Sequence, residues 1–121
     1  MGTNYYLQIK NTIFDECPLV IQERKNEIIE NLKLHIGKSS WGWRFLFQEQ
    51  EFNGKLINSY EYWKTLLTNP NYEIVDEYNQ VIDFKELDKL ILSRQNEQKH
   101  TYLDSHYLSF DGFDFDRTEF S

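Results

Sequence analysis

The chain has few of the features that usually reveal the class of a protein. Its 121 residues include one cysteine, Cys17, which excludes an internal disulfide framework. No apolar run approaches the about 18 residues of a membrane-spanning helix, and no segment resembles a signal peptide, so we expect a soluble cytoplasmic protein without a membrane partner. Basic residues number 13 against 20 acidic ones, and this net charge of −7 disfavours general binding to duplex nucleic acid, which needs lysine and arginine to neutralise phosphates.

Internal repeats, low-complexity tracts and linkers are also missing from the sequence. The length therefore predicts one compact domain over residues 1–121, large enough to bury a core without disulfides or metal ions. Aromatic residues make up 17% of the chain, which suits either a core rich in rings or an interaction surface.

The spacing of apolar residues predicts an α+β fold, a mostly antiparallel sheet with about three helices packed on one face. One helix is expected to begin after Ser59 as its N-cap, and another after a capping box formed by Asp83 and Glu86. A third is expected over residues 18–32, with Pro18 in its first turn. The predicted strands cover residues 3–10, 34–40, 43–50, 72–75 and 80–82, followed by a C-terminal strand pair.

Residues 35–45, HIGKSSWGWRF, form the segment with the most chemistry, because glycines, hydroxyls, cations and indoles lie close together. Ammonium and hydroxyl donors beside glycine can hold an anion, and indole rings offer flat faces to a base or a cation. The alternative is a structural turn stabilised by its own hydroxyl hydrogen bonds. The residues predicted to bind a ligand or partner are His35, Lys38, Ser39, Ser40, Trp41 and Arg44. Of the two tryptophans we expect Trp43 in the core and Trp41 partly exposed.

Catalytic and metal sites are not predicted. Gly37-Lys38-Ser39 resembles the end of a P-loop, but Leu32 stands where the motif needs its first glycine. His35 is the natural general acid or base, yet no nucleophile and base can be paired around it, so an enzyme is the weaker hypothesis and no cofactor is expected. A zinc site would need about four ligands, and a calcium loop needs a spacing that the acidic C-terminal segment lacks. The residues considered for metals are Cys17, His35, His100, His106, Asp111, Asp114, Asp116 and Glu119. We expect the aspartates to lie on a solvated strand edge, with Phe113 and Phe115 directed inward.

The opening MGTNYY, residues 1–6, and the segment HIGKSS-x-GW-x-F resemble a family of small proteins encoded by bacteriophages, prophages and some bacteria. The blocks at residues 76–79 and 111–121 extend this resemblance over most of the chain. It implies a phage or prophage setting inside a bacterial host, and no established reaction. The resembling proteins often carry paired cysteines between the first strand and HIGKSS, where this chain has Cys17 alone and a predicted helix.

Two functions are consistent with these observations. The first is a phage- or prophage-encoded interaction protein that inhibits a bacterial antiviral defence system, its acidic aromatic surface occupying a basic nucleic-acid or nucleotide site of a host protein. The second is a small-ligand module that binds or sequesters a phosphate-bearing nucleotide signal through HIGKSSWGW. Exposed sheet edges also make a homodimer a candidate assembly.

Overall fold

The computed structural model describes residues 2–40, 42–52, 54–97, 107–110 and 113–116. Seven strands form the main sheet, in the order β7-β6-β1-β2-β3-β9-β8, and β4 and β5 form a separate hairpin. Every pair of neighbours is antiparallel except β3 and β9, so the predicted α+β class with a mostly antiparallel sheet is confirmed. The strands are β1 (Gly2–Ile9), β2 (Leu34–Ser40), β3 (Leu46–Gln48), β4 (Gln50–Phe52), β5 (Lys55–Ile57), β6 (Tyr72–Asp76), β7 (Val81–Ile82), β8 (Tyr107–Phe110) and β9 (Phe113–Asp116).

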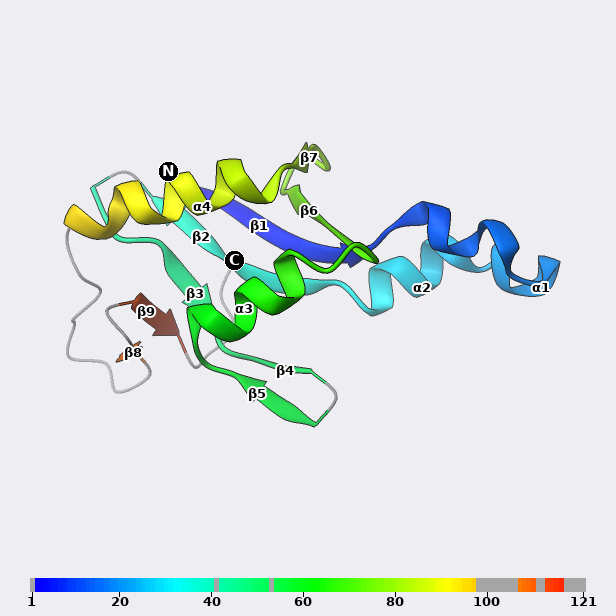
Figure 1. Ribbon diagram of the computed structural model, residues 1–121, viewed down its shortest axis with the longest axis horizontal. Coiled ribbons are helices and arrows are strands. Elements are labelled where there is room, and N and C mark those ends of the chain that lie inside the picture. The colour runs from blue at the N-terminus through cyan, green and yellow to red at the C-terminus, as the bar shows by residue number, and fades with distance from the viewer. Residues whose placement is uncertain (1, 41, 53, 98–106, 111–112, 117–121) are drawn as a thin grey trace.

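Two helices, α3 (Tyr60–Leu67) and α4 (Phe84–Ser93), cover one face of the sheet (Figure 1). Their apolar stripes meet the inward side chains of the strands in a single core cluster, centred on the fully buried Trp63 of α3. Tyr60 of α3 donates a 2.5 Å hydrogen bond to Asp88 Oδ1 of α4, which joins the two helices above the sheet. The buried members of the cluster are Leu7, Ile36, Phe45, Phe47, Ile57, Tyr60, Trp63, Leu66, Leu67, Ile74, Leu87, Ile91 and Phe115.

The two predicted helix starts differ in their capping. Ser59 Oγ accepts a 3.2 Å hydrogen bond from the amide of Tyr62, which confirms Ser59 as the N-cap of α3. The capping box at the start of α4 is wrong, because the side chain of Asp83 makes no capping hydrogen bond. Instead, the amides of Glu86 and Leu87 are bonded to the backbone carbonyl of Asp83, at 3.0 and 3.1 Å.

The connection between β1 and β2 leaves the body of the protein as a helical hairpin, here called the arm and comprising residues 10–33 (Figure 1). It contains the 3₁₀ helix η1 (Asn11–Glu16), then α1 (Leu19–Gln22) and α2 (Lys25–Asn31). The continuous helix predicted over residues 18–32 is therefore wrong. A short helix in water depends on packing of one apolar face, and neither α1 nor α2 has a buried residue.

A second 3₁₀ helix, η2 (Arg94–Asn96), extends the C-terminal end of α4. Within the described residues, no helix is long and apolar enough to cross a membrane.

Candidate functional site

His35 is a buried structural residue of β2. Its Nε2 lies 2.9 Å from the side-chain oxygen of Asn4 on β1, and its ring stacks on Tyr6 at a centroid distance of 5.0 Å. Lys33 lies over the ring of Tyr6, with its Nζ 5.0 Å from the centroid of that ring. Burial of Tyr6 is the main cause that raises the pKa of its phenol, and the carboxylate of Glu77 adds to it. His35 is thus enclosed by partners within the sheet, where a ligand does not reach it directly.

Gly37 is required by packing between strands. A Cβ added to this residue would lie 2.3 Å from the carbonyl oxygen of Leu46 and 2.6 Å from Cε1 of Phe45. The glycine faces Tyr5 of β1 in the register, and the rings of Tyr5 and Phe45 meet across it at 6.0 Å. Gly37 therefore lets an aromatic ring lie directly on the strand. The predicted strand over residues 34–40 is confirmed here, the backbone turns at Gly42 with a φ of 83°, and the anion site stays a prediction.

The three polar residues that follow are divided between the two faces of the sheet. Lys38 is paired with Asn4, and Ser40 with Gly2, on the face that carries His35. Ser39 is paired with Thr3 on the opposite face and is 8% exposed. Because neighbouring residues of a strand point to opposite faces, Ser39 does not converge with Lys38 and Ser40 on one anion.

Lys38 and Ser40 both lean over Gly2. A Cβ at Gly2 would come within 2.6 Å of Lys38 Cε and of Ser40 Oγ, so the glycine makes room for both side chains. Each remains half-buried, and together they form the part of the predicted site that stays near solvent.

The end of the segment is fixed to the body by Arg44. Its Nε donates a 3.0 Å hydrogen bond to the carbonyl oxygen of Gln95, just beyond α4. Trp43 is half-buried and does not belong to the core cluster, which corrects its predicted core position. Trp41 lies outside the described residues, so its predicted exposure stays a prediction.

The face of the sheet opposite the helices carries a layer of buried polar side chains. Asp114 and Asp116 of β9 are 2% and 3% exposed, because β9 lies between β3 and β8. Their predicted place on a solvated strand edge is wrong, whereas Phe115 does enter the core as expected. Gln48 of β3, 2% exposed, donates to the backbone oxygen of Asp116 at 3.2 Å. No group of three His, Cys, Asp or Glu side chains suited to a metal ion occurs among the residues described.

The block at residues 76–79 is a turn closed by its own side chains. Asp76 Oδ1 accepts from the amides of Tyr78 and Gln80, at 2.8 and 2.9 Å. Glu77 Oε1 accepts from the amide of Asn4 at 2.9 Å, and so extends the sheet beyond the end of β6. Asn79 has a φ of 64°, a conformation in which asparagine and glycine are favoured. These hydrogen bonds account for the block by folding alone.

The arm presents the feature that folding does not explain, a cluster of exposed apolar side chains at its outer end. Leu19 is 70% exposed, Val20 63% and Ile21 38%, and Ile13 of the neighbouring η1 is 39% exposed. We call these four residues, with the acidic side chains described next, the arm tip. None of the core cluster residues, buried or partly buried, belongs to residues 10–33. The only buried side chain of the described arm is Phe14.

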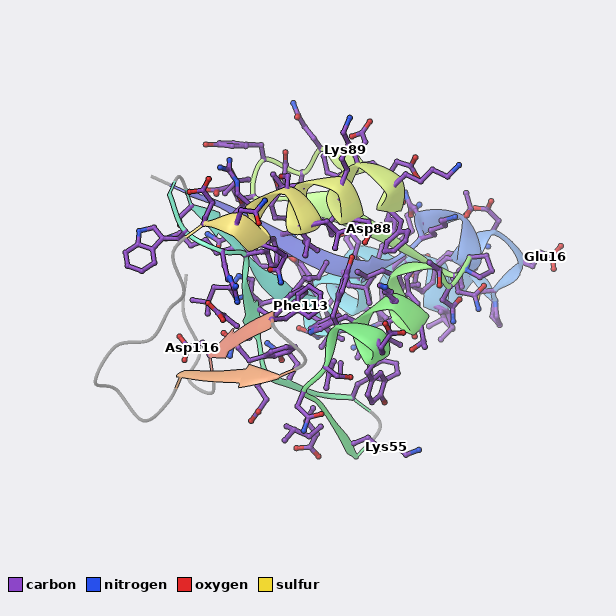
Figure 2. All side chains as sticks on the ribbon, turned by 60° about the vertical axis from the view of Figure 1, so that its left-hand side comes forward. Glu16, Lys55, Asp88, Lys89, Phe113 and Asp116 are labelled. Atoms are coloured by element: carbon purple, nitrogen blue, oxygen red, sulfur yellow. The ribbon has the colours of Figure 1, made fainter. Side chains whose placement is uncertain are left out.

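The charges of the arm separate along its length. At the start of α2, Arg24 directly follows Glu23 and pairs with Glu27 at 3.3 Å, and nearer the body Lys33 pairs with Glu30 at 3.8 Å. The outer segment, residues 15–23, contains three acidic residues and no basic one. Figure 2 shows Glu16 at the end of the arm, pointing away from the body. The carboxylates of the arm tip are Asp15, Glu16 and Glu23.

Comparison with protein-family models, curated proteins and solved structures found no match for this chain. The candidate site therefore rests on geometry, which favours the arm tip over the predicted HIGKSSWGW segment. Sequence reasoning missed this site because it assigned the apolar residues near Pro18 to a packed helix. The available signal was the run Leu19-Val20-Ile21, since three consecutive apolar residues cannot share one face of a helix.

Proposed function

We propose that this protein acts by binding another protein through its arm tip, as an inhibitor encoded by a phage or prophage and directed at a bacterial antiviral defence system. The observation that carries the proposal is the arm itself. Antiparallel neighbours such as β1 and β2 can be joined by a loop of two to five residues, yet this chain places residues 10–33 between them. Long connections of this kind are commonly functional.

The exposed apolar residues support binding to a protein in particular. A cluster of large aliphatic side chains in water is unfavourable unless a partner covers it, and such clusters mark interaction sites. Leu19 and Val20 stand next to each other at the end of a projecting hairpin, where a cleft of a partner can enclose both. The phage or prophage setting comes from the resemblance of the sequence blocks to phage-encoded proteins, and the choice of a defence system as target is our proposal from that setting.

The nucleotide-binding alternative has less support. It needs donors that converge beside an exposed ring, whereas His35 is bonded to Asn4, Ser39 points to the opposite face from Lys38, and Arg44 is bonded to Gln95 of η2.

Cross-linking at Cys17 tests the proposal. This residue is the only cysteine of the chain and lies beside Pro18 at the arm tip, so a thiol-reactive photo-cross-linker attaches there alone. After illumination in a lysate of a bacterial host, we expect one predominant adduct that mass spectrometry identifies. The double variant Leu19→Ser/Val20→Ser should lose this adduct. Its matched control is Leu56→Ser/Leu92→Ser, which changes two leucines that are 49% and 50% exposed outside the arm and should retain it.

Phage plating tests the class of target. Expression of the protein in strains that each carry one defence system should restore plating of a sensitive phage on at least one of them, and the arm-tip double variant should not. Restored plating by that variant, or an adduct that survives it, would place the binding surface elsewhere.

A further inference from the structure

The carboxylates of the arm tip are uncompensated. Asp15, Glu16 and Glu23 are all exposed, and in the described part of the chain none of them lies within ion-pairing distance of a lysine or arginine. Glu27 and Glu30, nearer the body, do have such partners. Near the apolar end of the arm, Arg24 is paired with Glu27, so the three unpaired carboxylates outnumber the one other cation there, Lys25.

This arrangement selects among the surfaces that would cover the apolar residues. Burial of aliphatic side chains supplies affinity without distinguishing one apolar partner from another. Unpaired carboxylates beside them repel nucleic acid and anionic lipid, and attract a surface that carries lysine or arginine. The charge therefore decides the kind of partner, and the apolar residues decide how tightly it is held.

We infer that the arm tip recognises a basic amphipathic protein surface, one with apolar residues flanked by lysine or arginine. This inference rests on the proposed function and specifies the chemistry of its partner. The four apolar side chains form a patch smaller than the about 800 Å² per partner of a standard interface, and suit the apolar centre of one. The three carboxylates lie in the same outer segment of the arm as this centre, where a partner's cations meet them as the contact closes.

A designed peptide serves as the probe. An amphipathic helix of leucine and lysine reproduces the inferred surface, and a helix of leucine and glutamate has the same apolar face with the opposite charge. Titration of ¹⁵N-labelled protein with the leucine–lysine peptide should shift the backbone signals of residues 13–23 first. The leucine–glutamate peptide should leave these signals in place.

Two variants separate the contributions. Leu19→Ser/Val20→Ser should weaken binding of the leucine–lysine peptide by about tenfold or more, as expected for central contact residues. Asp15→Asn/Glu16→Gln/Glu23→Gln should weaken it about fivefold at low salt and flatten its dependence on salt between about 50 and 200 mM. The control Glu61→Gln/Asp83→Asn/Glu86→Gln removes the same charge from exposed positions on and beside α3 and α4, and should have a much smaller effect.

The inference is overturned by equal effects of the two charge variants, which would indicate attraction by net charge alone. Equal binding of both peptides, or binding of the arm tip to phosphatidylglycerol vesicles, would also overturn it. These results are independent of the cross-linking experiment. If a Cys17 adduct forms but the protein does not prefer the basic peptide, the inferred chemistry is wrong and the proposed function stands. If the basic peptide binds the arm tip but no adduct forms, the inferred chemistry stands and the proposed function is wrong.

Discussion

Removal of the arm separates its contribution to stability from its contribution to binding. The variant we consider replaces residues 10–31 by Asn-Gly. Leu7 and Leu34 are paired in the register, so continued pairing brings Ile9 opposite Leu32, where a two-residue turn can close the hairpin. We expect this variant to fold, because no residue of the arm belongs to the core cluster.

The expected change in the free energy of unfolding is small because its two parts oppose each other. The connection shortens from 22 to two residues, which is about three and a half halvings. At about 0.6 kcal/mol of loop-closure entropy per halving, this favours folding by about 2 kcal/mol. The variant loses the 3.0 Å hydrogen bond from the Lys10 amide to Asn71 and the contact of α2 with β1, which we set at about 2 kcal/mol together. The net change should therefore stay within about 2 kcal/mol of zero.

Urea unfolding followed by tryptophan fluorescence measures this quantity, since Trp63 is fully buried in the core. The same variant should give no arm-dependent adduct when a cysteine is introduced into its turn. A loss of stability above about 4 kcal/mol would refute the reasoning, because it would show that the arm is part of what holds the sheet together. An adduct that persists without the arm would refute its role in binding.

Five further outcomes follow from the contacts of the body. Gly37→Ala should destabilise by about 3 kcal/mol or more in urea, because its Cβ would lie 2.3 Å from a backbone oxygen. His35→Leu should cost about 1–3 kcal/mol by leaving a buried amide without its 2.9 Å partner, and Lys38→Ala less than about 0.5 kcal/mol. Burial, and next the hydrogen bond to Asp88, raises the pKa of Tyr60 above its usual 10.0. The folded state therefore favours the protonated phenol, and the free energy of unfolding should fall as pH rises above 10. Tyr60→Phe should reduce that fall in unfolding curves measured at alkaline pH. A nucleotide panel should leave the thermal midpoint unchanged, and a rise that Lys38→Ala removes would revive the nucleotide alternative.

The parts of the fold that the sequence predicts are those fixed by local pattern. Alternation located β1 and β2, the apolar stripe located α4, and the Ser59 hydroxyl marked the start of α3. The position of β9 was beyond such reasoning. It pairs in parallel with β3 across more than sixty residues of chain, so the burial of its aspartates depends on a contact that no local spacing encodes.

The described residues of the predicted site lie apart for a related reason. A strand distributes consecutive residues over two faces, so donors that are adjacent in the sequence HIGKSS do not all point to one place. Its residues fall into separate environments: His35 stacked on Tyr6, Gly37 under Phe45, and Ser39 on the opposite face from Lys38. The arm tip was missed because its apolar run suggested a packed helix. Among the described residues, none of that run belongs to the core cluster.

The blocks that carry the family resemblance are neighbours in the sheet, and they fit one another. Gly2 in the first block makes room for Lys38 in the second, Asn4 binds His35, and the third block returns through Glu77 to the amide of Asn4. Each residue of this set has a partner within the fold, which is sufficient reason for the blocks to occur together. The arm lies between the first two blocks and contributes Lys33, whose Nζ lies 5.0 Å from the centroid of the Tyr6 ring beside this network.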